Sequence, residues 1–163
     1  MSEAWLRDFF LFYHTTYLKR GQTGYLTEAF FRGLMADMAA DTCFALAFRG
    51  DHLIAGALFL KDAHTLYGRY WGASEDVDCL HFEVCYYQGI EYAIRNGLSR
   101  FDPGTQGEHK IPRGFEPTAT WSAHWLAHRE FHELIRQHMR RERDHMAAYM
   151  AEAETLLPFK VTD

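Results

Sequence analysis

The fold is decided by residues 43–71, which read CFALAFRGDHLIAGALFLKDAHTLYGRYW. Apolar or aromatic runs alternate here with short polar breaks: the runs are Cys43–Phe48, Leu53–Leu60 and Thr65–Trp71, and the breaks are Arg49–Asp51 and Lys61–His64. Breaks this short are typical of hairpin turns and leave no room for a crossover helix. The stretch therefore predicts an antiparallel meander of three strands.

Helices are predicted on both sides of this meander. Within residues 2–19, apolar residues recur at spacings of three and four, which indicates an amphipathic helix, and a second helix is expected to begin at Thr27 as its N-cap. After the meander, a long helix over residues 78–96 is expected to end at Gly97. The remaining elements are a short strand at Leu98–Phe101, an irregular segment rich in Pro and Gly at Asp102–Ala123, and a last helix from roughly His128 to Glu154.

Composition limits the class of protein. With 163 residues and 48% hydrophobic content, the chain is long enough for one compact domain, predicted over residues 1–163. The sequence has no run of about 18 apolar residues and no pattern of a secretory signal, so we expect no membrane span and a cytoplasmic location. Three cysteines without CxxC spacing predict reduced, mostly buried thiols. The net charge of −5 argues against a general binder of polyanions.

The order of the predicted elements places the chain in the α+β class. Two helices, three antiparallel strands, a helix and a further strand resemble the core of a GNAT-type acyltransferase that lacks its first strand. A missing strand would leave one edge of the sheet unpaired. We therefore expect the chain to associate, either as a homodimer or with a first GNAT-like domain.

Two carboxylates are predicted to point inward from the helix over residues 78–96. On a wheel of about 100° per residue with Leu80 at zero, Glu83 and Glu91 fall at roughly 300° and 20°, within the apolar arc that also contains Tyr87. A buried carboxylate must be protonated, be paired with a cation, or face a wet cleft. Glu83 is therefore a candidate general base, and Tyr87 and Glu91 are candidates for substrate binding, while structural pairing with Arg or Tyr is the alternative.

A second group of candidates lies in the segment GTQGEHKIPRGF at residues 104–115. Glycines let backbone amides approach a ligand closely, and Lys110 and Arg113 could hold a carboxylate or a phosphate. Glu108 is a further candidate for substrate binding, and His109 is a candidate catalytic group. The alternative is a solvated, charged loop.

Three histidines, His124, His128 and His132, recur every four residues, as metal ligands do on a continuous helix. His124 is expected to precede the last helix, and no carboxylate close in sequence completes an open site. No metal is therefore predicted, and His124 is kept as a candidate catalytic residue.

Short motifs follow one another along the chain. In order they are YWG at 70–72, LHFE at 80–83, CYYQ at 85–88, QGEHK at 106–110, RGF at 113–115 and SAHW at 122–125. This series resembles a bacterial family of predicted N-acyltransferases, which is related to the Fem-type aminoacyltransferases of peptidoglycan synthesis. The resemblance implies two tandem GNAT-like domains that share an active site, and this chain corresponds to the second of them.

The resemblance implies transfer of an acyl or aminoacyl group onto an amine acceptor. Glu83 would accept the amine proton, with His109 and His124 as further catalytic groups, and Lys110 and Arg113 would hold the anionic donor or acceptor. No cofactor is expected to be permanently bound. The rival interpretation is a non-catalytic binding module that is inactive without the first domain.

The donor would be an acyl-CoA or an aminoacyl-tRNA, and nucleic acid is a partner only in the second case. In GNAT enzymes, backbone amides at the turn into the helix after the fourth strand receive the CoA pyrophosphate. Here that turn reads GASEDVD at residues 72–78, and its three acids suit a helix N-terminus but would repel a pyrophosphate. The turn therefore argues against acetyl-CoA.

Overall fold

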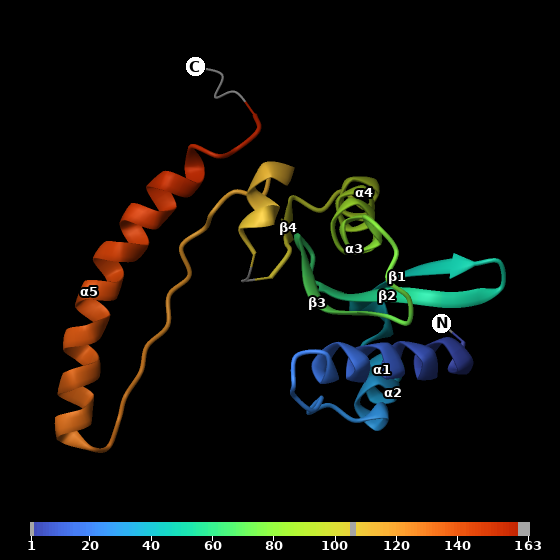
Figure 1. The fold of residues 1–163 in the computed structure, drawn as a ribbon, viewed down its shortest axis with the longest axis horizontal. Coiled ribbons are helices and arrows are strands. Elements are labelled where there is room, and N and C mark those ends of the chain that lie inside the picture. The colour runs from blue at the N-terminus through green and yellow to red at the C-terminus, as the bar shows by residue number, and fades with distance from the viewer. Residues whose placement is uncertain (1, 105–106, 160–163) are drawn as a thin grey trace. The chain divides into compact units, whose positions relative to one another are not determined.

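The computed structural model describes residues 2–104 and 107–159. It contains two compact units, unit 1 (Met1–Gly104) and unit 2 (Thr105–Asp163), and each is described by itself. The elements of unit 1 are α1 (Glu3–Leu18), α2 (Glu28–Asp37), a 3₁₀ turn (Ala39–Asp41), β1 (Thr42–Arg49), β2 (His52–Lys61), β3 (Thr65–Ala73), α3 (Leu80–Phe82), a π-helix (Glu83–Tyr87), α4 (Gln88–Arg95) and β4 (Arg100–Asp102) (Figure 1).

Unit 1 is built around a four-stranded mixed sheet in the order β1-β2-β3-β4. The first three strands form the predicted antiparallel meander, and β4 lies parallel to β3. The pairing between β3 and β4 covers only residues 65–67 of β3, so the rest of that strand continues without β4 beside it. The α+β class and the meander are confirmed.

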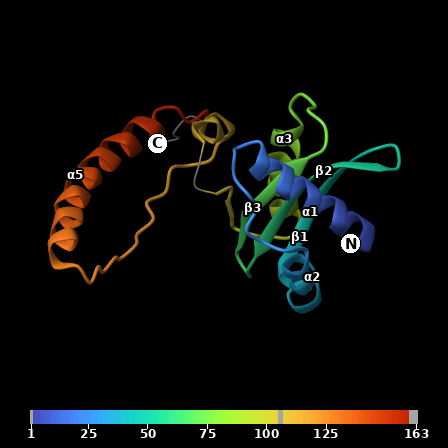
Figure 2. The ribbon, with the colours of Figure 1, turned by 60° about the horizontal axis from the view of Figure 1, so that its bottom comes forward.

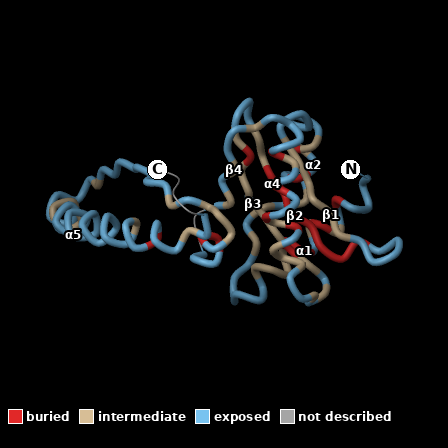
Figure 3. Tube along the Cα trace, turned by 90° about the horizontal axis from the view of Figure 1, so that it is seen from above, coloured by how far each residue is buried: buried red, intermediate tan, exposed pale blue. Residues whose placement is uncertain are grey.

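Helices cover both faces of the sheet. Helices α1 and α2 lie on one face, and the segment from α3 to α4 lies on the other (Figure 1). Because successive side chains of a strand point to opposite faces, Leu58 packs with the first pair of helices, while Ala57 and Phe59 face the second segment. Figure 3 shows that the buried residues of unit 1 gather along the sheet and the helices that face it.

Helix α1 crosses the strands at close range (Figure 2). At Gly72 of β3, a Cβ atom would overlap the backbone carbonyl of Phe12. The Thr16 hydroxyl lies 3.1 Å from the Trp71 carbonyl oxygen and donates a hydrogen bond to it. The glycine of the YWG motif is therefore the residue that lets α1 lie directly on β3.

The prediction that Glu83 and Glu91 point inward is wrong, because both are exposed. The predicted helix contains the π-helix over residues 83–87, and one π turn adds about one residue to the helical repeat. As a result Val84 and Gly89, five residues apart, share the buried face. A helical wheel of uniform period therefore assigns the residues that follow the π turn to the wrong side of the helix.

The elements of unit 2 are a 3₁₀ helix (Glu108–Arg113) and α5 (Arg129–Glu154). The 3₁₀ helix corrects the expectation of a wholly irregular segment over 102–123, of which residues 105–106 lie outside the described residues. Helix α5 confirms the predicted last helix, with His128 as its N-cap. The buried residues described in unit 2 are Lys110, Ile111 and Ala153.

Other expectations concern the thiols and the membrane. Cys79 is exposed, and Cys43 and Cys85 are half-buried, so the thiols are less buried than predicted. Among the described residues, no helix is both long and apolar enough to cross a bilayer.

Candidate functional site

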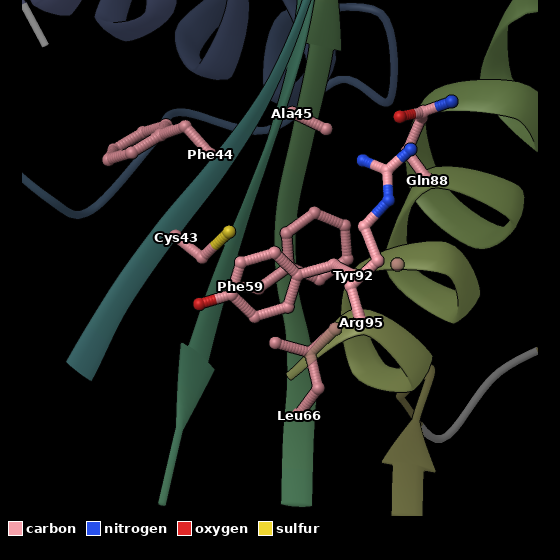
Figure 4. Close-up of a pocket in the computed structure, with 9 residues that line it drawn as sticks. Cys43, Phe44, Ala45, Phe59, Leu66, Gln88, Tyr92 and Arg95 are labelled. Carbon is pink, nitrogen blue, oxygen red and sulfur yellow. The ribbon is translucent and has the colours of Figure 1, made fainter. Parts of the chain in front are cut away.

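A cavity of about 110 Å³ lies in unit 1, where α4 faces β1 and β2 (Figure 4). It is named the α4 pocket here, and it is lined by Cys43, Phe44, Ala45, Phe59, Leu66, Gln88, Gly89, Tyr92 and Arg95. Its floor is apolar, formed by Phe59 and Leu66, and the side chains of the helix supply polar groups at the rim.

The pocket exists because β1 presents small side chains to α4. Cys43 and Ala45 alternate with Phe44, whose neighbours are the residues of α1 on the opposite face. Small side chains on the edge strand leave space beneath the larger ones of the helix. Gln88, Tyr92 and Arg95 extend over this space from α4 (Figure 4).

Cys43 and Tyr92 form a neutral pair in the wall of the α4 pocket. Burial raises the pKa of the Cys43 thiol, and a hydrogen bond with Tyr92 and the charge of Lys61 act weakly in the opposite direction. Burial also raises the pKa of the Tyr92 hydroxyl, with a smaller contribution from Cys43. Both groups therefore stay protonated at neutral pH, and Cys43 is not an activated nucleophile.

The two carboxylates predicted from the helix border this pocket from outside. Glu83 accepts a hydrogen bond of 2.8 Å from the side-chain amide of Gln88, and Glu91 forms an ion pair with Arg95. Since Gln88 and Arg95 line the pocket, each carboxylate lies one hydrogen bond away from its rim. Tyr87 is 47% exposed and does not line the pocket.

Four predicted residues of unit 2 lie on its 3₁₀ helix. Lys110 is buried, Arg113 is half-buried, and Glu108 and His109 are exposed. The Arg113 guanidinium donates to the backbone carbonyl of His109. His124 lies outside this helix, where its Nε2 is 2.8 Å from the Ser122 hydroxyl.

The three histidines spaced by four residues have separate local contacts. His128 Nδ1 accepts from the Phe131 amide at the start of α5, and His132 Nδ1 accepts from the Leu126 amide. Within residues 2–104 and 107–159, no group of three His, Cys, Asp or Glu side chains is arranged to hold a metal ion. The absence of a metal stays a prediction.

Sequence reasoning missed several residues of the α4 pocket. On a helical wheel of uniform period Gln88, Tyr92 and Arg95 fall on the polar side, and the inserted π turn places them at the pocket instead. The signal that could have indicated a cavity is the small residue at every second position of β1, at Cys43, Ala45 and Ala47. Such a series on a strand leaves space under a facing helix.

The FemAB-like family model, described as peptidoglycan biosynthesis/recognition, matches residues 1–161. A search of curated proteins finds no match. The family match covers essentially the whole chain and confirms the predicted relationship to Fem-type proteins. The chain therefore belongs to the FemAB-like family.

Proposed function

We propose that the chain is a transferase domain that moves an acyl or aminoacyl group onto an amine in peptidoglycan biosynthesis. The observation that carries this proposal is the family match over residues 1–161. The order of elements in unit 1 supports it. Two helices, three antiparallel strands, a helix and a fourth, parallel strand follow one another as in a GNAT-like core without its first strand.

The α4 pocket is proposed to receive the transferred group. A cavity of about 110 Å³ accommodates a small acyl or aminoacyl group, with its apolar part against Phe59 and Leu66. The amide of Gln88 and the guanidinium of Arg95 at the rim can hydrogen-bond to the carbonyl oxygen of that group. The site thus combines an apolar floor with donors for the charge that develops on the oxygen.

Glu83 is proposed as the general base. The amine nitrogen attacks the acyl carbonyl carbon of an ester or thioester, Glu83 takes the proton that the nitrogen loses, and the oxygen or sulfur leaves with the acyl bond broken. A proton from solvent neutralises the leaving group. Glu83 is exposed and already accepts a hydrogen bond from Gln88, which orients its carboxylate at the pocket rim.

The remaining predicted residues are proposed to bind substrate or assist the chemistry. Tyr87 and Glu91 contribute from unit 1 to substrate binding. In unit 2, taken by itself, Glu108, Lys110 and Arg113 are proposed to bind substrate, and His109 and His124 are proposed as catalytic groups. Lys110 and Arg113 supply the positive charge that an anionic donor or acceptor requires.

An aminoacyl ester is the donor we favour over an acyl-CoA. Asp76 and Asp78 are exposed in the turn that precedes α3, and Glu75 in the same turn is paired with Arg49. Within the described residues neither Asp76 nor Asp78 forms an ion pair, and two such carboxylates repel a pyrophosphate at the place where a GNAT enzyme would bind it. An aminoacyl ester of tRNA carries its reactive group at the end of a nucleic-acid strand. Its binding does not require the turn that precedes α3.

The substitution Glu83→Gln tests the proposal. Turnover is measured with a panel of aminoacyl-tRNAs and acyl-CoAs and a lysine-containing peptide as the amine acceptor. We expect a loss of about 100-fold or more, the usual contribution of a general base. The melting temperature should hardly change, because Glu83 is exposed and surface substitutions cost about 0.5 kcal/mol or less.

Glu116→Gln is the matched control, since it removes an exposed carboxylate from a residue without a proposed role. It should retain activity. Saturable binding of a donor without turnover by the unsubstituted chain would contradict the transferase and support a binding module. A large drop in the melting temperature of Glu83→Gln would instead assign that residue a structural role.

A further inference from the structure

A β-bulge interrupts β3 on the face that α1 covers. Phe59 pairs with Gly68 and Leu58 pairs with Tyr70, so Arg69 is an extra residue without a partner on β2. Bulges redirect side chains and are frequent beside active sites. The pairing of β3 with β4 ends at Tyr67, two residues earlier. The bulge thus places Arg69 just beyond the residues of β3 that pair with β4.

Among the described residues, the charge of Arg69 has no carboxylate partner. Its guanidinium lies 5.3 Å from the centre of the Tyr70 ring, and the residue is exposed. In the described part of the chain, no carboxylate lies within ion-pair distance of it; the ion pairs found there involve Arg32, Arg49, Arg95 and Arg136. Arg69 also shares a side-chain hydrogen bond with Tyr70, and a guanidinium has five N–H donors, so further donors remain for a ligand.

Two tyrosine hydroxyls adjoin this arginine. The Tyr25 and Tyr70 oxygens are 2.8 Å apart. Burial raises the pKa of Tyr70 to about 12, the hydrogen bond with Tyr25 acts in the same direction, and Arg69 acts in the opposite one. The Tyr70 hydroxyl therefore carries its proton at neutral pH. The Tyr25 hydroxyl is also hydrogen-bonded to that of Tyr17. Three hydroxyls thus share two internal hydrogen bonds, so one of their three protons is left for an external acceptor.

The tyrosines are held in place before any ligand arrives. The Leu26 amide donates a hydrogen bond of 3.1 Å to the Tyr13 hydroxyl, which fixes the loop that carries Tyr25. Tyr13 packs edge-on against Tyr70, with ring centres 5.3 Å apart. At Gly24 the Tyr13 ring leaves no room for a side chain, so the loop lies tightly on α1. A fixed arrangement of this kind lowers the entropic cost of binding.

We propose that Arg69, Tyr70 and Tyr25 form a binding site for an anionic group, either a carboxylate or a phosphate. The guanidinium supplies charge and parallel N–H donors, and the tyrosine pair supplies an O–H donor. The site lies on the α1 face of the sheet, opposite the α4 pocket. It does not depend on the proposed transfer reaction, because binding is measured without turnover.

Titration of the full chain with inorganic phosphate and, separately, with acetate tests the proposal. Binding is followed by nuclear magnetic resonance at constant ionic strength. We expect at least one of the two anions to bind saturably, and the tighter one identifies the ligand class. Arg69→Gln and Tyr25→Phe should each weaken binding by about 10-fold or more, since hydrogen bonds to charged groups are the strong ones.

Arg7→Gln is the control, because it removes the same charge from an exposed arginine of α1. It should leave binding within about twofold of the unsubstituted chain. Arg69→Lys should weaken anion binding less than Arg69→Gln does and more than Arg7→Gln does, since lysine keeps the charge and loses the planar fork. The proposal is overturned if neither anion saturates, or if Arg69→Gln and Arg7→Gln weaken binding equally.

Discussion

Gly72 is the single residue on which the packing of α1 against the sheet depends most directly. The backbone carbonyl of Phe12 occupies the space that any larger side chain would need. Backbone atoms in the middle of a helix cannot move aside as the end of a flexible side chain can. Thr16, one turn further along α1, reinforces the contact through its hydrogen bond to Trp71.

We predict that Gly72→Ala destabilises the fold by about 3 kcal/mol, the upper end of the usual cost of overpacking. Gly33→Ala is the control, because Gly33 lies in α2 and a Cβ there meets no atom within 4 Å. That change should stabilise the chain by about 0.5–1 kcal/mol, since alanine favours a helix over glycine. Denaturant unfolding measures both, and equal effects would contradict the proposed close contact.

Among the elements, the turn between β2 and β3 depends on one carboxylate. Asp62 Oδ1 accepts hydrogen bonds of 2.7 Å from the backbone amides of His64 and Thr65, and Oδ2 accepts one of 2.8 Å from the Tyr67 hydroxyl. These hydrogen bonds lower the pKa of Asp62, and the one from the His64 amide contributes most. The ionised carboxylate therefore stabilises the folded hairpin.

The sign of this effect gives a prediction for pH. Because the folded-state pKa is lowered, the stabilisation is fully present above the pKa of an unfolded aspartate, about 4, and is lost as the pH falls through the folded-state value. Asp62→Asn should therefore lower the melting temperature at pH 7, and its difference from the unsubstituted chain should shrink in acid. Thermal melts between about pH 7 and 3 measure it. A difference that does not change with pH would show that charge is not the cause.

The elements themselves were largely predictable, because each has a local signal. The strands follow from apolar runs between short turns, and α1, α2 and α5 follow from periodicity and caps such as Thr27. The π turn at 83–87 and the bulge at Arg69 carry no comparable signal. Both are single-residue insertions into a regular repeat, and tertiary packing decides where they occur. For this reason the side of α4 that faces the sheet was mispredicted, and with it the lining of the α4 pocket.

At the scale of the whole molecule, apolar surface remains exposed. Trp121 and Trp125 in unit 2 are each 80% exposed, and on α5 Leu134 is 63% exposed. In unit 1, β1 is an edge strand of the sheet. Exposed aromatic residues and a strand edge are both typical of surfaces that bind a partner.

We therefore predict that the chain associates in solution. Light scattering after size-exclusion chromatography should give a mass above that of one chain, rising with concentration. Replacing both Trp121 and Trp125 with Ser should lower that mass if unit 2 supplies the contact between chains. Replacing Phe48 on β1 with a charged residue should lower it if the edge of the sheet supplies that contact. A monomer at high concentration would contradict the prediction.

The contact between α1 and β3 also sets an order of events during synthesis. Thr16 and Trp71 are 55 residues apart in the chain, so α1 leaves the ribosome long before the strand on which it packs. At about 5–20 residues per second, the interval is roughly 3–11 seconds. During that time Phe9, Phe12 and Tyr13, all buried in the finished fold, have no sheet to cover them. The apolar side of the nascent helix thus stays in contact with solvent until the third strand has been synthesised.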